Sequence, residues 1–266
     1  MSEIIYTDAE SVSALAKTIE EKPEVVVKTV PPSNAEVILP AGLIKEDGSL
    51  VKYAEVRELT GLDEEAISKA GSVGRALNVL LERGVVSIGS FPATKSDLEK
   101  LLSGDRDALL LGIRRVTFGN TVEFSFDCSF CKTPLDISLD LSNDIPVKEI
   151  EDPVNDRVFT YMSETKGPIV VSLPTGLVQK KLVENSDKTT AEINTILLAA
   201  CIRSVNGEPS MGPATALKLG MSDRDAIVVE IINRSPGPRL GEVTTTCEAC
   251  GEVLPMPLSL ADLFRL

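Results

Sequence analysis

Four cysteines, arranged as two Cys-x-x-Cys pairs, are the side chains of this sequence best suited to chemistry. The pairs are Cys128 with Cys131 and Cys247 with Cys250, and 115 residues lie between them. Each pair separates two alternating apolar patterns, so we expect it at the turn of a β-hairpin. Two such turns can present four thiolates to one zinc ion, at Zn–S distances of about 2.3 Å. The sequence therefore predicts a single structural zinc bound by all four cysteines.

Three other interpretations of these cysteines are redox-active pairs, two disulfides and unrelated free thiols. A thioredoxin-type pair lies at the N-terminus of a helix, where the helix dipole lowers the thiol pKa, whereas these pairs lie between strands. Stable disulfides need an oxidising compartment, and nothing in the sequence indicates one. The fifth cysteine, Cys201, lies in an apolar helical pattern and is expected to be a small buried side chain.

An internal repeat explains the long gap between the two cysteine pairs. Residues 104–141 and 221–258 each contain Asp-Arg-Asp-Ala, an apolar helical run, an alternating strand, Cys-x-x-Cys and a second strand. Asp105 and Asp223 are 118 residues apart, and the two cysteine pairs are 119 apart. Two further matches are residues 80–88 with 197–205, and Leu39–Leu43 (LPAGL) with Leu173–Leu177 (LPTGL). Pairing of the two copies would bring their hairpins together.

We therefore expect an α+β fold of internally duplicated helix-plus-β-hairpin units, related by a pseudo-twofold and joined by a four-cysteine, zinc-ribbon-like site. The expected parts are an N-terminal arm (1–34), a first repeat with a zinc knuckle (35–142), an acidic linker (143–167) and a second repeat with a zinc knuckle (168–266). The arm contains a helical pattern over residues 9–20 and a strand-like run over residues 25–30.

Apolar periodicity and turn residues predict the elements of each repeat. Expected helices are 62–70, 73–83, 105–117, 190–205 and 222–233, with a further helix starting at Thr94 and a last turn at 261–266. Expected strands are 35–39, 85–91, 121–127, 135–141 and 169–173, with a second cysteine hairpin at 243–258.

Charged residues accompany the predicted helices in both copies. In Asp105-Arg106-Asp107 and Asp223-Arg224-Asp225 the carboxylates fall in a first helical turn, where they stabilise free amides and the positive helix end. The arginines are expected to pair across the repeat axis. Arg114 and Arg115 are candidates to bind acidic groups of a partner.

Composition excludes several classes of function. The chain has 266 residues, no histidine, no tryptophan and a net charge of −13. Without histidine it lacks the commonest general base, and it contains no phosphate-binding glycine loop. Its acidic character disfavours direct binding to nucleic acid. It has no apolar run of about 20 residues for a membrane span, and its first residues do not resemble a secretory signal.

Three segments resemble those of the T-even-type bacteriophage base-plate protein family, which occurs widely among tailed phages. They are, in chain order, Val56–Glu65 (VRELTGLDEE), Leu102–Leu111 (LSGDRDALLL) and Phe124–Cys131 (FSFDCSFC). The resemblance is closest over residues 36–142. It extends to 168–266 mainly through Cys247-Glu248-Ala249-Cys250, and it leaves the arm outside.

This resemblance implies a non-enzymatic structural component of the tail base plate, in the hub region. Such a protein binds other tail proteins, is present in several copies in a symmetric assembly, and is found in the virion tail base plate and, before assembly, in the host cytoplasm. One alternative is a chaperone of hub assembly that is absent from the mature virion. An alternative of another class is a Cys-x-x-Cys redox enzyme, which the missing histidines and the placement of the cysteines disfavour.

Overall fold

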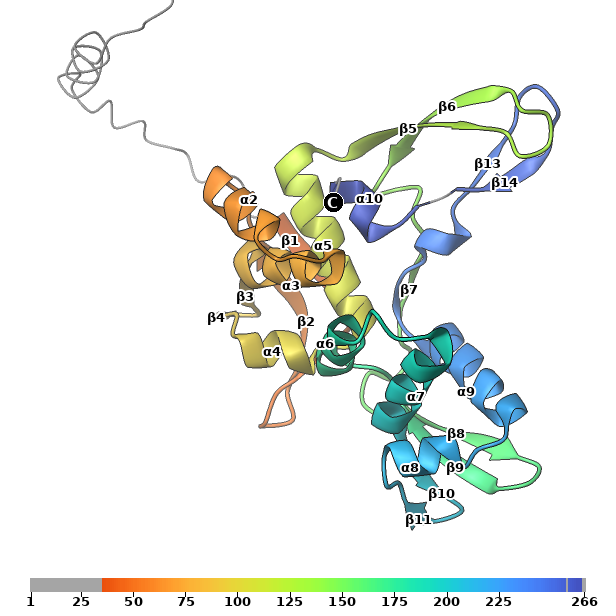
Figure 1. Ribbon diagram of the computed structural model, residues 1–266. Helices are drawn as coiled ribbons and strands as arrows, with labels where there is room; N and C mark the ends of the chain where they lie inside the picture. The colour runs from red at the N-terminus through yellow and green to blue at the C-terminus, as the bar shows by residue number, and fades with distance from the viewer. Residues whose placement is uncertain (1–34, 257, 265–266) are drawn as a thin grey trace, which may run out of the picture. The chain divides into compact units, whose positions relative to one another are not determined.

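The computed structural model describes residues 35–256 and 258–264 (Figure 1). The expected arm, with its helical pattern at 9–20 and its strand-like run at 25–30, lies outside the described residues. Over the described ranges the fold is mixed α+β, with helices and antiparallel sheets, as the sequence predicts. In this part of the chain, no helix combines the length and the apolar character that a bilayer span requires.

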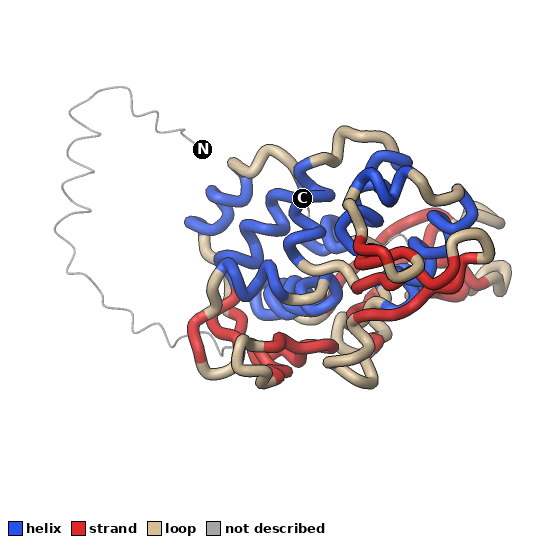
Figure 2. The backbone as a smooth tube through the Cα atoms, turned by 90° about the horizontal axis from the view of Figure 1, so that it is seen from below, coloured by secondary structure: helices blue, strands red, loops and turns tan. Residues whose placement is uncertain are grey.

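A four-stranded sheet and four helices occupy residues 35–118. They are β1 (Ala35–Ile44), β2 (Leu50–Val56), α2 (Gly61–Ser68), α3 (Val73–Gly84), β3 (Val85–Ile88), β4 (Phe91–Pro92), α4 (Lys95–Lys100) and α5 (Ser103–Phe118). The sheet is antiparallel in the order β1-β2-β3-β4. In β1, Val37 and Leu39 are buried while Glu36 and Ile38 are exposed, because alternate side chains face opposite sides of a strand. The buried face packs against α5, and Figure 2 shows helices and strands in separate layers.

A second sheet with four helices follows in the same order. Its elements are β8 (Val158–Ser163), β9 (Gly167–Ser172), α6 (Gly176–Glu184), α7 (Thr190–Cys201), β10 (Ile202–Val205), β11 (Glu208–Pro209), α8 (Pro213–Leu217) and α9 (Met221–Arg234). This sheet is also antiparallel, in the order β8-β9-β10-β11. The two sheets therefore share one strand order.

The two sheets also share their strand register. Pairs in β2–β3 are Ala54–Ile88, Glu55–Ser87 and Val56–Val85, and pairs in β9–β10 are Ile169–Val205, Val170–Ser204 and Val171–Ile202. In both ladders the register shifts by one residue between the second and third pairs. Such a shift is a local irregularity of the kind that a β-bulge produces, and it falls at the same point of both ladders.

Local signals in the sequence determine where the helices begin and end. The hydroxyl of Thr94 and the carboxylate of Asp97 form a capping box at the start of α4, as predicted. Helix α5 ends at Gly119, whose φ of 86° is unfavourable for a residue with a Cβ atom. The predicted stop at Gly84 is the last residue of α3.

Two hairpins lie beyond the two sheets. The first is β5 (Thr121–Asp127) with β6 (Pro134–Asp140), and the second is β13 (Thr244–Thr246) with β14 (Val253–Pro255). Their tips lie next to each other in Figure 1. The remaining elements are β7 (Val147–Lys148), which pairs with β12 (Gly237–Pro238), the 3-10 helix η1 (Leu240–Glu242) and α10 (Leu260–Phe264).

Buried side chains form one large cluster around each sheet and a small cluster at the hairpin tips. Leu109 and Ile113 of α5 are fully buried in the first cluster, and Ile169 and Ile227 in the second. Burying such a side chain contributes roughly 1.5–3 kcal/mol. Helix α10 packs against α5, and its Leu263 is buried in the first cluster. Residues near the C-terminal end of the described chain therefore contribute to the core around the first sheet.

Several predicted elements differ from the observed ones. The helix predicted over 190–205 ends at Cys201, and the β-branched residues Ile202 and Val205 continue as β10 because they pair with β9. Strand β2 and helices α6 and α8 were not predicted. Residues 143–167, expected as an acidic linker, contain β7 and β8. Leu39–Leu43 lies within β1 whereas Leu173–Leu177 follows β9 and runs into the start of α6, so this sequence match is not a structural one.

The predicted pseudo-twofold does not extend to the helices. Helix α6 packs against α3, α4 and α5. Helix α2 follows β2 along the chain as α6 follows β9, but over the described residues no comparable packing joins α2 to α7, α8 or α9. A twofold would make these contacts reciprocal. The packing between the two halves therefore does not follow the predicted pseudo-twofold.

The paired arginines do not meet across an axis either. Arg106 donates to the Leu98 carbonyl (2.9 Å) and to Asn78, and Arg224 donates to the Ala216 carbonyl (2.8 Å), each within its own half. Asp105 was expected to bond amides of its own helix. Instead, its Oδ1 accepts N–H groups of Ala41 (2.7 Å) and Gly42 (3.1 Å) in β1, because α5 crosses that strand.

Candidate metal centre

The first cysteine pair lies in the tight turn between β5 and β6. The Cys128 N–H donates to the Thr133 carbonyl (2.9 Å), and the Lys132 N–H donates to the Cys128 carbonyl (2.9 Å). Lys132 has a φ of 60°, a left-handed conformation that lets the chain reverse directly after Cys131. The turn therefore directs both sulfur atoms to one side of the hairpin.

The second pair repeats this turn between β13 and β14. The Cys247 N–H donates to the Glu252 carbonyl (2.9 Å), and the Gly251 N–H donates to the Cys247 carbonyl (2.8 Å). Gly251 has a φ of 75° at the position that Lys132 occupies in the first turn. Both pairs are thus between strands, where the sequence places them, and not at a helix N-terminus.

The four sulfur atoms form one cluster, all within 4.8 Å of one another. Cys128 Sγ lies 3.7 Å from Cys250 Sγ, and Cys131 Sγ lies 3.6 Å from Cys247 Sγ. In each contact the first cysteine of one pair meets the second cysteine of the other. A tetrahedron with Zn–S bonds of about 2.3 Å has sulfur–sulfur edges of about 3.8 Å. The cluster therefore has the dimensions of a four-sulfur metal site.

One cysteine of each pair is buried and the other is exposed. Cys128 and Cys247 are fully buried beside Leu135 and Leu254, whereas Cys131 and Cys250 face solvent. This arrangement fixes two ligands in a small apolar cluster and leaves two at the surface. All four are free thiols, with no disulfide among them.

Neighbouring groups shift the pKa values of the exposed thiols in opposite directions. Hydrogen bonding by the Thr133 hydroxyl, 3.3 Å from Cys131 Sγ, and by the Thr133 N–H lowers the pKa of Cys131 to about 6. For Cys250 the Glu252 N–H acts to lower the pKa, but desolvation and the adjoining sulfurs outweigh it and raise the pKa to about 12. An ionised thiol in the cluster raises the pKa of a neighbouring thiol, because like charges at this distance repel.

The donor set fits a thiophilic metal. Over the described residues, the four cysteines are the group of His, Cys, Asp and Glu side chains close enough to share one ion. Four thiolates in a tetrahedron are a typical ligand set for structural zinc and for iron–sulfur centres. Cys201 is separate from the cluster. It is fully buried in the second core, as predicted, and burial raises its pKa to about 12.

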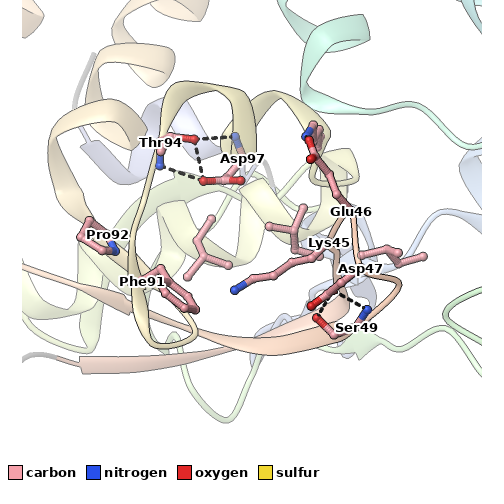
Figure 3. Close-up of a pocket in the computed structure, with 12 residues that line it drawn as sticks. Lys45, Glu46, Asp47, Ser49, Phe91, Pro92, Thr94 and Asp97 are labelled. Atoms are coloured by element: carbon pink, nitrogen blue, oxygen red, sulfur yellow. Dashed lines mark hydrogen bonds and ion pairs between the residues drawn. The ribbon is translucent and has the colours of Figure 1, made fainter.

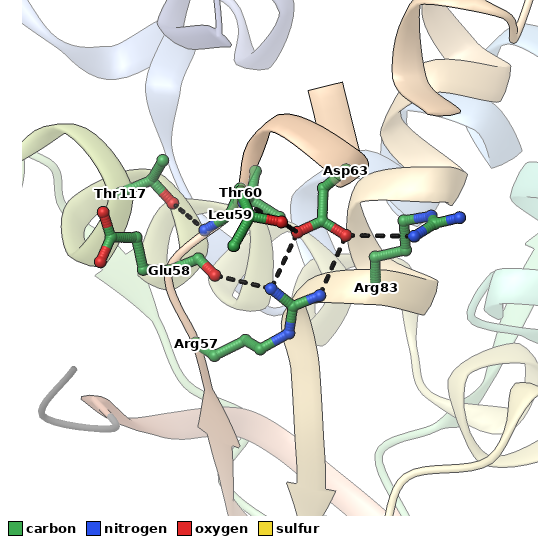
Figure 4. Close-up of polar contacts among 7 residues, drawn as sticks. All are labelled: Arg57, Glu58, Leu59, Thr60, Asp63, Arg83 and Thr117. Carbon is green, nitrogen blue, oxygen red and sulfur yellow. Dashed lines mark hydrogen bonds and ion pairs between the residues drawn. The ribbon is translucent and has the colours of Figure 1, made fainter. Parts of the chain in front are cut away.

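A polar network fixes the segment between β2 and α2 (Figure 4). The guanidinium of Arg57 donates two hydrogen bonds to Asp63, at 2.8 and 3.0 Å, and Arg83 donates a third at 3.2 Å. Asp63 also caps α2 through the N–H and hydroxyl of Thr60. The hydrogen bonds from Arg57 above all hold the pKa of Asp63 well below its usual range. Every group in this network has a structural partner, so it is a stabilising contact rather than a reactive site.

A cavity of about 580 Å³ lies between the β1–β2 turn and the start of α4 (Figure 3). The ammonium group of Lys45 lies 4.2 Å from the ring centre of Phe91 at its rim. Asp47 accepts bonds from Ser49 and thereby closes the turn. The hydroxyls of Ser49 and Thr94 donate to the carboxylates of Asp47 and Asp97, each within its own turn or helix cap. These polar groups are therefore satisfied by local structure.

The two arginines considered as partner anchors differ in exposure. Arg114 is buried, where its Nε donates to the Leu263 carbonyl (2.7 Å) and a second nitrogen donates to the Gly119 carbonyl (3.0 Å). It therefore holds α10 on α5 and is not at the surface. Arg115 is exposed.

A family model described as T4 bacteriophage base plate protein matches residues 22–211. The match includes the whole first half and extends into the second, through β11. It also begins inside the segment 1–34 that the sequence resemblance left outside, and it ends before Cys247. No curated protein and no solved structure matches the chain.

Proposed function

Because the chain belongs to the T4 bacteriophage base plate protein family, we propose that it is a zinc-stabilised structural component of the tail base plate, in the hub region. It binds other tail proteins there and catalyses no reaction. The four-sulfur cluster carries the proposal, since it joins two hairpins that are distant in sequence. The metal ligands are Cys128, Cys131, Cys247 and Cys250.

The proposal includes an internal duplication. The equal strand order, the equal register with its shift at one position, and the equal turns at the two cysteine pairs support it. The two units are residues 35–142 and 168–266, and the second also takes β8 as the counterpart of β1. Each unit supplies one knuckle, so a complete metal site needs both.

The metal gives such a subunit rigidity where its core is smallest. The hairpins extend beyond the two large cores, and among the described residues Leu135 and Leu254 are buried with the cysteines at their tips, with Phe126 and Ile137 partly buried beside them. A two-stranded hairpin alone is marginally stable in water. Zinc binding adds a cross-link whose free energy is coupled to folding of the tips. A stiff connection of this kind suits a protein that must keep its shape inside a large assembly.

Metal content and assembly of a single variant test the proposal. Elemental analysis of the purified protein should give about one zinc per chain and no iron. Cys247→Ser should lose the metal, and phage carrying it should stop assembly at the base-plate stage. Cys201→Ser is the matched control, because it removes a buried cysteine outside the cluster. Normal infectious particles with Cys247→Ser, or protein that carries no metal, would contradict the proposal.

Residence in the virion separates a structural component from an assembly chaperone. Mass spectrometry of purified particles should detect this chain among the tail proteins. Its absence from particles that need it for assembly would reassign it as a chaperone.

A further inference from the structure

Two of the four sulfur atoms in the metal centre are open to solvent. Cys131 and Cys250 are exposed, one on each hairpin, whereas Cys128 and Cys247 are buried. A small oxidant in the medium can therefore reach one sulfur of each turn directly. Exposure and thiolate character are the two properties that make a cysteine susceptible to oxidation.

Each exposed sulfur contacts a buried sulfur of the opposite hairpin. The distance is 3.6 Å from Cys131 Sγ to Cys247 Sγ and 3.7 Å from Cys250 Sγ to Cys128 Sγ. These two contacts use all four cysteines, and each of them joins β5–β6 to β13–β14. A disulfide bond is about 2.0 Å long, so each contact has to shorten by less than about 2 Å for the bond to form.

The backbone favours shortening between the hairpins over shortening within one turn. In the first turn, the Cys128 N–H donates to the Thr133 carbonyl and the Lys132 N–H donates to the Cys128 carbonyl, and the second turn has the same two bonds. These bonds fix the spacing of the two cysteines on one turn. The two hairpins are separate two-stranded sheets, so their tips can approach each other without breaking a ladder hydrogen bond.

An apolar contact keeps the tips together independently of a metal. Leu135 of β6 and Leu254 of β14 form one buried cluster with Cys128 and Cys247. The paired sulfurs of opposite hairpins therefore stay near each other when the bonds to a metal are lost.

The proposed function, on which this inference rests, places the protein in two environments. A tail component is made in the host cytoplasm, where reductants maintain cysteines as thiols. It leaves that compartment when the particle is released into the medium. Zinc bound by thiolates suits the first environment, and disulfides suit the second.

We propose that oxidation of the metal centre by a peroxide replaces the zinc with two disulfides between the hairpins, Cys131–Cys247 and Cys128–Cys250. The two tips then stay joined in an environment where thiolates do not persist. The metal centre is in this sense a clamp with two chemical forms.

The chemical step is the ordinary oxidation of a pair of thiolates. The exposed thiolate of Cys131 attacks one oxygen of the peroxide, the O–O bond breaks, hydroxide leaves, and the sulfur becomes a sulfenic acid. The thiolate of Cys247 attacks that sulfur, the S–S bond forms, the S–O bond breaks, and a second hydroxide leaves. The two cysteines have lost two electrons, and the peroxide has gained them. Cys250 and Cys128 consume a second peroxide in the same way, and the zinc is released because its ligands are gone.

Linkage mapping of the full-length, zinc-loaded protein after treatment with hydrogen peroxide tests the inference. The protein is unfolded in the presence of an alkylating reagent that blocks free thiols, and is digested without reduction. Trypsin leaves both cysteines of each turn on one peptide, 116–132 for the first turn and 240–265 for the second. The expected disulfides join these two peptides. Disulfides within the turns would instead leave them separate, each lighter by two hydrogen atoms.

Further cleavage assigns the individual pairs. Chymotrypsin cuts after Phe130 and glutamyl endopeptidase cuts after Glu248, in each case between the two cysteines of a turn. The resulting fragments should show the two linkages proposed above and not the opposite pairing.

Metal release and hydrogen exchange give two further readouts. One zinc ion should appear in solution for every two disulfides formed. After removal of the metal with a chelator, the backbone amides of β5 and β13 should exchange more slowly in the oxidised protein than in the reduced protein. Cys201→Ser is the control and should behave as the wild type, because Cys201 is buried in the second core.

The outcomes separate this inference from the proposed metal site. Disulfides within the turns, sulfinic acids in place of disulfides, or zinc that stays bound during oxidation would overturn the inference. Elemental analysis before oxidation tests the metal site by itself. A chain that carries one zinc but forms no disulfide between the hairpins overturns only the redox inference. A chain that carries no zinc but still forms both linkages overturns only the zinc clamp.

Discussion

Replacement of Asp63 by alanine should destabilise the protein strongly although the residue is far from the metal centre. Asp63 is 1% exposed and accepts bonds from three residues, Arg57, Arg83 and Thr60. Alanine leaves the N–H at the start of α2 and the Arg57 guanidinium without this partner. The same change removes the carboxylate that joins α2 to the end of α3.

The size of the effect follows from the exposure of the partners. Loss of a helix N-terminal cap costs about 1 kcal/mol. Removal of one member of a fully buried ion pair costs about 3–5 kcal/mol. Here the side chains of Arg57 and Arg83 are 32% and 44% exposed, so both cations can turn to water. We therefore expect about 3 kcal/mol in total, below the roughly 4–6 kcal/mol that the cap and a fully buried ion pair would give together.

Urea unfolding at equilibrium measures the change in the free energy of unfolding, with Glu64→Ala as the control. Glu64 is the exposed neighbour on the same helix, and its loss should cost less than about 0.5 kcal/mol. The pKa of Asp63 is lowered in the folded protein, so its stabilisation is present above its unfolded pKa, near 4, and is lost as the pH falls further. The difference between wild type and Asp63→Ala should therefore shrink in acid. Equal stability of the two alanine variants at neutral pH would refute this account of the network.

Two further predictions concern a backbone conformation and a buried charge. Gly251→Ala should cost about 1 kcal/mol because of the positive φ alone, since a Cβ atom there meets nothing, whereas Gly241→Ala, with equal space and no positive φ, should be nearly neutral in the same urea assay. Burial raises the pKa of Asp105 from an ordinary value near 3.8 to about 6, so the stability of the wild-type protein should fall as the pH rises from 4 to 6. The variant Asp105→Asn keeps an oxygen for the β1 amides but cannot ionise. Between pH 4 and 6 the free energy of unfolding of the wild-type protein should fall by about 3 kcal/mol relative to this variant. Parallel pH profiles of the two proteins would contradict this prediction.

The cysteine cluster could be predicted because each half of it is a local motif. A Cys-x-x-Cys turn between two alternating strands fixes its own geometry within about a dozen residues, and both hairpins lie where the sequence places them. Helix limits were predictable for the same reason at Thr94, at Gly119 and at Gly84, where capping chemistry is local. The family resemblance, read from three short motifs, is confirmed by the family match.

Two strands, β2 in the first sheet and β8 in the second, are harder to predict. Strand β2 contains Lys52 and Glu55 among its apolar residues, and β8 lies in a segment whose acids and prolines are typical of a linker. Both form because a neighbouring strand supplies their hydrogen bonds. Strand formation of this kind depends on partners distant in sequence, so no local pattern indicates it.

The relation between the two halves is the feature that sequence symmetry alone predicts wrongly. Similar sequence motifs favour similar units, but the way in which two such units pack depends on small differences at their surfaces. In the first half, Gly104 lets the chain after α9 approach α5; in the second half the corresponding residue is Ser222, and it is exposed. Gly74 likewise lies against Val183 of α6, whereas its counterpart Ala191 is exposed. At both places the first half has a glycine, which permits the close contact, and the second half has a residue with a Cβ atom, for which the same contact has no room. The packing of the two halves therefore depends on individual residues at the contact, and a sequence repeat alone does not determine it.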